Sequence, residues 1–313
     1  MEPILPLIKL NKKPQRLSAW LTDPFLCLFI ILIAAGYIIS SIQTASWAAN
    51  LIYIAAVTID SLVVLFLVRT QAPASVAVPK PGLECAIMAG WYVAFMIGLT
   101  LTKAAGIFAD EFSKWLWFII LPLVILFAIR GRGSDIKTLF RSVGFRRQGI
   151  GKAILTGLIA YAVMIPAVLF TMPYSQLQKL GIIFRSPVKA LVLLPVAFLF
   201  SLITAAGTKE IFFRGILQQR IARALRSELR ACLIAAFLFG IYHLPYAYFL
   251  SDWPTHGNFT WAFSSVLVEQ MMAGLILGIL WLRTRNIAAP ILFHALVDTI
   301  AIMTMLPAML HIR

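Results

Sequence analysis

Residues 189–215 read KALVLLPVAFLFSLITAAGTKEIFFRG, a long apolar run that ends in charged residues. Its uncharged part, about 190–207, has the length that an α-helix needs to cross the hydrocarbon core of a bilayer. Lys209, Glu210 and Arg214 follow within a few residues. Charged groups in or near a bilayer are costly, so they are candidates for function. The stretch predicts a membrane span with a polar site at its end.

Similar apolar segments recur along the whole chain. The 313 residues are 61% hydrophobic and only 12% charged. We count nine candidate spans, with ends uncertain by several residues, at about 24–43, 47–68, 85–102, 115–129, 153–172, 190–207, 229–250, 262–282 and 287–308. The expected fold is an all-α, polytopic transmembrane bundle of about eight or nine spans.

The chain is strongly basic, with 27 Lys and Arg against 12 Asp and Glu and a formal net charge of +15. The basic residues lie mostly in short loops between apolar segments, and the positive-inside rule then predicts a cytoplasmic N-terminus. We expect the protein to lie in the plasma membrane. Lys179, Arg185 and Lys189 oppose this topology, because they would lie outside. No basic-aromatic module accompanies the charge, so nucleic acid is not expected as a partner. The loop 130–152 is either an interfacial segment that touches anionic lipid or a solvated loop.

The cysteines and the N-terminus suggest no further chemistry. Cys27, Cys85 and Cys232 all lie in apolar segments and form neither a disulfide pattern nor a zinc-ligand spacing. The first apolar run follows a basic arm and precedes no clear cleavage site, so it is interpreted as a retained span. We expect no cofactor.

Polar residues recur at helical spacing in the second half. Three i, i+4 pairs lie in three different apolar segments: Glu210 with Arg214, Phe239 with His243, and His294 with Asp298. This spacing puts both members of a pair on one helix face, which in lipid should turn to the bundle interior. Each pair alone has an ordinary explanation: an interfacial ion pair, a histidine that bonds a carbonyl freed by a proline, or a local hydrogen bond. Together they predict a polar cavity formed by the last four spans.

The chemistry of this set fits amide hydrolysis. One carboxylate and two histidines can deprotonate a water, bind an oxyanion and protonate a leaving amine. The same groups could hold a divalent metal ion, but the HExxH spacing that usually marks that solution is absent.

The pairs resemble the motifs of the CPBP family of intramembrane proteases, which includes the type II CAAX prenyl endopeptidases and the bacterial Abi proteins. The family motifs are EExxxR, FxxxH and HxxxN/D, and the similarity here covers about residues 189–304. The resemblance implies that His243 and His294 stabilise the oxyanion and orient the water. It also implies that Arg214 holds the glutamate, that Asp298 orients His294, and that Phe239 packs beneath the cavity. A glutamate-activated water, without a metal, is the mechanism that it implies.

The resemblance fails at one position, because Lys209 stands where the family has the first glutamate of its motif. Successive helical residues point about 100° apart, so Glu210 cannot simply replace the missing carboxylate. A neutral Lys209 could act as a base, alone or with Ser201 or Thr208.

Two further acids, Asp60 and Glu269, lie inside apolar spans. Glu269 belongs to the span before the His294 helix, and we hypothesise that it could supply a replacement carboxylate. A buried Glu269 bonded to a neighbouring Ser or Gln is the ordinary alternative.

Three interpretations remain open. The chain is an active intramembrane endopeptidase, a catalytically inactive relative that acts as a scaffold or regulator, or a transporter. A transporter is the least expected, because no repeat of the two halves is detectable. We expect the protease core at residues 153–313. Residues 1–152 would contain the N-terminal spans and the basic loop. The expected substrate is a membrane protein or lipidated peptide that reaches the site from the cytoplasm; the oligomeric state stays open.

Overall fold

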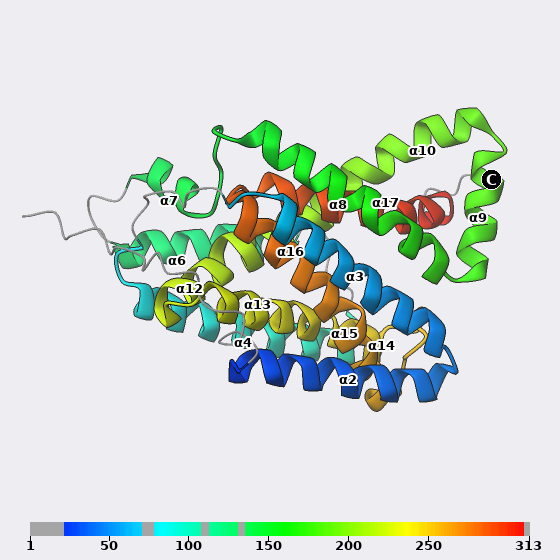
Figure 1. Ribbon diagram of the computed structural model, residues 1–313, viewed down its shortest axis with the longest axis horizontal. Coiled ribbons are helices and arrows are strands. Elements are labelled where there is room, and N and C mark those ends of the chain that lie inside the picture. Colours follow the sequence, from blue (N-terminus) through cyan, green and yellow to red (C-terminus); the bar gives the residue numbers. More distant parts are fainter. Residues whose placement is uncertain (1–21, 71–77, 108–112, 131–134, 310–313) are drawn as a thin grey trace, which may run out of the picture.

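The computed structural model describes residues 22–70, 78–107, 113–130 and 135–309, and every regular element in these ranges is helical (Figure 1). The first half contains α2 (Pro24–Thr44), α3 (Trp47–Leu67), α4 (Pro81–Ala104), α5 (Ser113–Trp115), the π-helical segment η1 (Leu116–Ile120), α6 (Leu121–Arg130), α7 (Ile136–Ser142) and α8 (Ile150–Thr171). The second half contains α9 (Tyr174–Phe184), α10 (Pro187–Phe200), η2 (Ser201–Ala206), α11 (Gly207–Glu210), η3 (Ile211–Gln218), α12 (Gln219–Leu225), α13 (Glu228–Tyr242), α14 (Leu244–Phe249), α15 (Phe259–Val268), α16 (Gln270–Thr284) and α17 (Ala288–Met309).

The predicted membrane bundle is confirmed. Among the described residues, nine helical segments are long and apolar enough to cross a bilayer. Their outer surface is apolar: Phe66 is 82% exposed and Leu191 77% exposed. Large apolar side chains in water would be unfavourable, whereas lipid tails accommodate them. We conclude that the chain is an integral membrane protein.

The sixth segment is longer than the sequence pattern predicts. The apolar run ends near residue 207, but the helix continues without a break from Pro187 to Leu225. Lys209, Glu210 and Arg214 are buried by neighbouring helices, so their charges interrupt the apolar pattern without ending the helix. The polar residues therefore lie within this helix and not at its end.

Small residues bring α13 and α16 into close contact. A Cβ atom added at Gly274 would lie 2.9 Å from the backbone of Ala236, and one added at Gly240 would lie 3.0 Å from Cβ of Met271. Such close approach is typical of helix pairs in membranes, where small residues let backbones meet. Gly157 plays the same part between α8 and α17, since its added Cβ would lie 2.9 Å from the carbonyl oxygen of Ala289.

Aromatic rings from the first half pack behind the long helix. Phe118 of η1 stacks on Phe212 with ring centroids 4.8 Å apart, and it meets Tyr242 of α13 edge-on at 5.4 Å. Tyr92 of α4 adds a stacked contact with Phe212 and donates a hydrogen bond of 2.7 Å to the carbonyl of Leu238. The N-terminal spans thus hold two of the motif-bearing helices in place.

A buried charge cluster joins α4, α6 and α12. Glu84, which is fully buried, accepts hydrogen bonds from Arg130 and from Arg220, with nitrogen–oxygen distances of 3.1–3.3 Å. Arg220 also donates to the carbonyl oxygens of Gly215 and Ile216. A buried carboxylate needs such partners to offset its lost hydration. Glu84 thereby fastens the end of the long helix to the first half of the chain.

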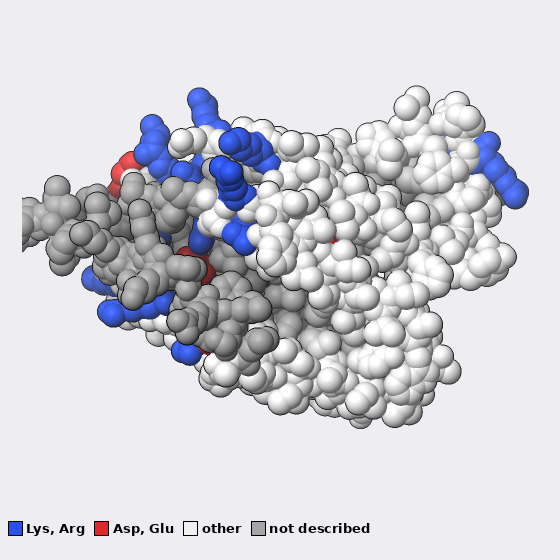
Figure 2. Space-filling view, viewed as in Figure 1, with Lys and Arg blue, Asp and Glu red and all other residues white. Residues whose placement is uncertain are grey.

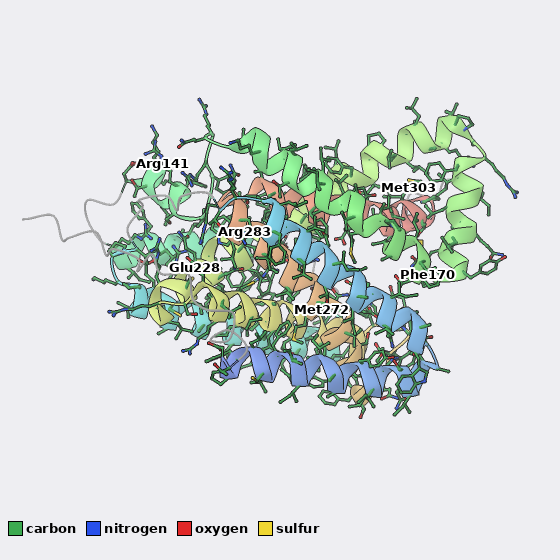
Figure 3. The ribbon with its side chains drawn as sticks, viewed as in Figure 1. Arg141, Phe170, Glu228, Met272, Arg283 and Met303 are labelled. Atoms are coloured by element: carbon green, nitrogen blue, oxygen red, sulfur yellow. The ribbon has the colours of Figure 1, made fainter. Side chains whose placement is uncertain are left out.

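Charged side chains gather at one end of the bundle, which we call the basic end (Figure 2). Figure 3 places Arg141, Glu228 and Arg283 toward this end, Met272 in the middle of the bundle, and Phe170 toward the opposite end. A second, smaller basic patch lies at that opposite end (Figure 2). This charge asymmetry is the pattern on which the positive-inside rule operates. The orientation of the N-terminus stays a prediction.

Candidate functional site

The site is built on an irregular part of the long helix. Two π-helical segments, η2 and η3, flank the single turn of α11 that carries Lys209 and Glu210. Short π-helical insertions shift the register of a helix and are frequent at functional sites. Here they place Lys209, Glu210 and Arg214 in the interior of the bundle, where all three are buried.

Glu210 lies at the centre of a chain of charged groups. Its Oε1 lies 2.7 Å from Nδ1 of His294, and its Oε2 accepts a hydrogen bond of 3.0 Å from Nε of Arg214. Nε2 of His294 lies 3.3 Å from Oδ2 of Asp298. The Glu210 side chain is fully buried, whereas that of Asp298 is 32% exposed. Two of the predicted pairs are therefore joined into one network across the α11 and α17 helices.

Both oxygens of Glu210 are already occupied by these partners. A carboxylate that binds a guanidinium and an imidazole is held rigidly and is a poor acceptor for a further proton. His294, which lies between two carboxylates, can donate from both ring nitrogens only as the protonated imidazolium. The geometry therefore suits Glu210 to positioning His294, and His294 to presenting positive charge.

The ring of Phe239 lies next to both histidines. It lies 5.0 Å from the ring of His243 and 5.8 Å from that of His294, measured between centroids. The Arg214 guanidinium carbon lies 5.1 Å from the same ring, which is a cation–π distance. Phe239 is 2% exposed, and its expected packing beneath a cavity stays a prediction.

His243 has a defined tautomer. Its Nδ1 lies 2.8 Å from the carbonyl oxygen of Phe239. A carbonyl can only accept, so Nδ1 carries the proton, and the neutral ring keeps a lone pair on Nε2. His243 therefore bonds a backbone carbonyl, but it is that of Phe239 and not that of Ile241, which is the carbonyl that loses its helical donor at Pro245. This bond orients His243 and leaves Nε2 as a proton acceptor.

Lys209 adds a cation beside this acceptor. It is 8% exposed and lies within electrostatic range of His243, His294 and Asp298. Within the part of the chain that the structure describes, it makes no ion pair with a carboxylate. The site thus holds an ammonium group where the family motif has a carboxylate.

The other sequence candidates have different surroundings. Oε1 of Glu269 accepts a hydrogen bond of 3.3 Å from Ser265, which is the ordinary alternative considered for this residue. Tyr53 of α3 donates to the backbone oxygen of Glu269 at 3.1 Å and lies within electrostatic range of Asp298. Sequence reasoning missed Tyr53, because a lone tyrosine in a span carries no motif. Asp60 is buried, and neither carboxyl oxygen has a hydrogen-bond partner among the described residues.

No metal site is apparent in the described ranges. No group of three or more His, Cys, Asp and Glu side chains there is arranged to hold a metal ion. Lys209 and Arg214 would also place positive charge next to any ion bound by the Glu210 and His294 side chains, which disfavours binding.

One comparison identifies a family. Residues 190–300 match the family described as type II CAAX prenyl endopeptidase Rce1-like. Residues 190–300 form an Rce1-like domain. Comparisons with curated proteins and with solved structures found no match.

The Rce1-like domain contains every residue of the three motifs. It begins in α10 and ends in α17, so that it includes Glu210, His243, His294 and Asp298. The predicted resemblance to the CPBP family is confirmed for this part of the chain. The role of each residue stays a prediction.

Proposed function

We propose that this chain is an intramembrane endopeptidase of the CAAX-processing type, which hydrolyses a peptide bond of a membrane-associated protein or lipidated peptide. The observation that carries the proposal is that the rings of His243 and His294 both lie next to the ring of Phe239. A proton acceptor and a cationic donor then stand at one place, inside a domain of this protease family.

The arrangement supports a water-activation step that differs from the one implied by the family motif. Nε2 of His243 accepts a proton from water, and the hydroxide attacks the scissile carbonyl carbon. His294 and Lys209 stabilise the negative charge that develops on the carbonyl oxygen. The His243 imidazolium then gives its proton to the leaving nitrogen, and the products are a carboxylate and an amine. Glu210 and Arg214 hold His294 in place.

One observation favours a second candidate, a relative that binds membrane peptides without cleaving them. Lys209 replaces the carboxylate that activates water in the family, and both oxygens of Glu210 are occupied. A site with an added cation can hold a peptide carbonyl or carboxylate without completing hydrolysis. The two candidates differ only in whether the chain as it stands cleaves.

Peptide cleavage in proteoliposomes distinguishes the candidates. The chain, Lys209→Glu and His243→Ala would be assayed side by side against prenylated and unprenylated membrane peptides. Cleavage by the chain that is lost in His243→Ala supports the proposed endopeptidase. Cleavage by Lys209→Glu alone supports the non-cleaving relative.

His256→Ala is a matched control for the histidine variant. His256 is exposed in the loop between α14 and α15, away from the motif residues. Its replacement should leave cleavage unchanged. A comparable loss in both histidine variants would contradict the assignment of His243.

A further inference from the structure

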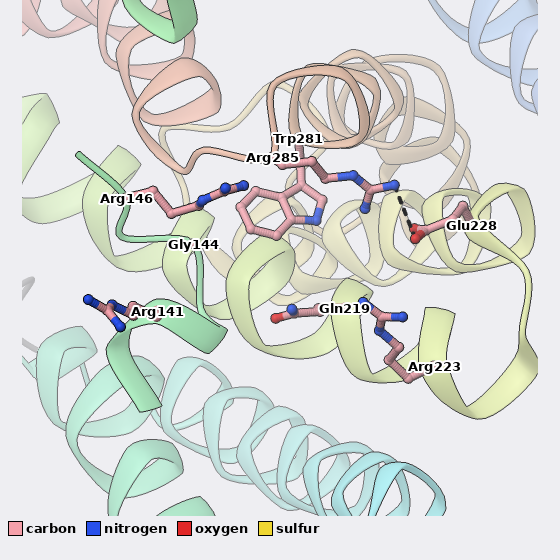
Figure 4. A pocket seen from close by; sticks show the side chains of 8 residues that line it. All are labelled: Arg141, Gly144, Arg146, Gln219, Arg223, Glu228, Trp281 and Arg285. Atoms are coloured by element: carbon pink, nitrogen blue, oxygen red, sulfur yellow. Dashed lines mark ion pairs between the residues drawn. The ribbon is translucent and has the colours of Figure 1, made fainter. Parts of the chain in front are cut away.

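A second polar site lies at the basic end, outside the motif residues (Figure 4). It is a small pocket, with about 20 Å³ of space for the centre of a water-sized group. Its lining comes from α7, the following loop, α12, α13 and α16: Arg141, Gly144, Arg146, Gln219, Arg223, Glu228, Trp281 and Arg285. We call it the arginine pocket. Neither the sequence motifs nor the proposed protease function uses it.

The arginine pocket has a marked excess of positive charge. Four of its lining residues are arginines, and Glu228 is the one acid among them. Glu228 pairs with Arg285 at 3.1 Å, as the dashed line in Figure 4 shows. Among the described residues, neither Arg141 nor Arg223 makes an ion pair with a carboxylate, so their positive charges are not balanced within the lining. Such a surplus of positive charge favours an anion.

The interior of the arginine pocket also contains a buried donor without a partner. Trp281 is only 3% exposed, yet its Nε1 makes no hydrogen bond within the described residues. Indole N–H groups usually find a partner when buried, because an unpaired donor costs free energy. Nε of Arg285 is buried and unpartnered in the same way. Figure 4 shows the indole among Arg146, Gln219, Arg223 and Arg285.

The backbone at Gly144 packs directly against the Trp281 ring. Gly144 has φ +96°, and a Cβ added there would collide with the Trp281 ring. Asn286 follows Arg285 in the chain: its side chain donates a hydrogen bond of 2.8 Å to the carbonyl of Arg146 and accepts one of 3.0 Å from the N–H of Ala288. The arginine pocket is therefore a built feature that joins the basic loop to the start of α17.

We propose that the arginine pocket binds a phosphate group, carried either by an anionic phospholipid headgroup or by a small soluble phosphate compound. Guanidinium groups present paired N–H donors that match phosphate oxygens, and Trp281 adds a neutral donor. The basic end of a membrane bundle lies at the level of lipid headgroups, where such groups are concentrated. The two sources share one chemistry and differ in the group to which the phosphate is attached.

The position of the arginine pocket links it to the motif helices. Arg223 lies on the continuation of the Glu210 helix, Glu228 begins the His243 helix, and Arg285 precedes the His294 helix. A phosphate bound to Arg223 and Arg285 joins the end of the Glu210 helix to the start of the His294 helix, and Arg285 also pairs with Glu228 at the start of the His243 helix. Binding would therefore resist their separation and raise the thermal stability of the domain.

Direct binding tests the proposal without any cleavage assay. The purified chain in neutral detergent would be titrated calorimetrically with short-chain phosphatidylglycerol, inorganic phosphate and short-chain phosphatidylcholine, at constant ionic strength. The test variants are Arg223→Gln and Trp281→Phe, which remove a charged and a neutral donor. Arg147→Gln is the control, because Arg147 is exposed and next to Arg146 but does not line the pocket.

The proposal predicts saturable binding of phosphatidylglycerol or phosphate. Arg223→Gln should weaken it about tenfold or more, as expected for the loss of one charged hydrogen bond, and Trp281→Phe should weaken it by a smaller factor. Preference for phosphatidylglycerol identifies a lipid site, and preference for phosphate a soluble ligand. The proposal would be overturned if neither phosphatidylglycerol nor phosphate binds, or if phosphatidylcholine binds as tightly as phosphatidylglycerol. It would also be overturned if Arg147→Gln weakens binding as much as Arg223→Gln does.

Discussion

Nδ1 of His294 lies 2.7 Å from Oε1 of Glu210, although 84 residues separate them in the chain. This contact joins the first and last motifs of the Rce1-like domain. Because the other carboxylate oxygen accepts from Arg214, Glu210 links a guanidinium to an imidazole. Because both carboxylate oxygens are occupied, we assign Glu210 the role of positioning His294. The proton acceptor that we then propose is His243, whose Nε2 keeps a lone pair.

Loss of the Glu210 charge should destabilise the protein. Glu210→Gln leaves the fully buried Arg214 without its counter-charge, and breaking a buried ion pair in this way costs about 3–5 kcal/mol. The measurement is the free energy of unfolding in detergent micelles. Glu228→Gln is the control: its side chain is 43% exposed, so the expected loss is at most about 1 kcal/mol. Similar losses in the two variants would contradict the buried network.

Gly274→Ala should disrupt the site from a distance. The added methyl group would lie 2.9 Å from the backbone of Ala236, so α16 and α13 must move apart and shift His243. The expected destabilisation is about 1–3 kcal/mol, with reduced cleavage, measured by thermal unfolding and peptide hydrolysis. Gly98→Ala in α4 is the control, because no atom of the described residues lies within 4 Å of its added Cβ. If Gly98→Ala is as harmful, helix packing at Gly274 is not the cause.

The rate of cleavage should depend on the protonation of His243. Nε2 accepts a proton from water only while it is unprotonated, so kcat/KM should be high at alkaline pH and fall as the pH is lowered. In Lys209→Glu a carboxylate becomes available as the acceptor. A carboxylate and an imidazole take up a proton at different pH values, so the fall should occur at a different pH in this variant. Identical pH profiles for the chain and Lys209→Glu would exclude His243 as the acceptor that determines the rate.

The membrane fold and the three motifs could be predicted from the sequence, because apolar length and i, i+4 spacing are local properties. Across the described residues, the number of spans agrees with the structure, and so do their approximate ends except that of the sixth. The continuation of the sixth helix to Leu225 could not be predicted, because its charges are buried only by neighbours distant in sequence.

The partners of the polar residues also depend on tertiary structure. Spacing pairs Glu210 with Arg214 but says nothing of its contact with His294 on α17. Glu84 and its two arginines come from three separate helices and form no motif. The same is true of the lining of the arginine pocket. The domain division at residue 152 and the cytoplasmic access to the site remain predictions.

The most direct test of the proposed function is hydrolysis in water enriched in oxygen-18. Reconstituted chain, His256→Ala and His243→Ala would be incubated with the panel of membrane peptides, and the products analysed by mass spectrometry. We predict that the chain and His256→Ala release a fragment whose new carboxylate carries one oxygen-18 atom from water, and that His243→Ala releases it at least about a hundredfold more slowly. The absence of labelled fragment from the chain, or its undiminished release by His243→Ala, would contradict the proposed function.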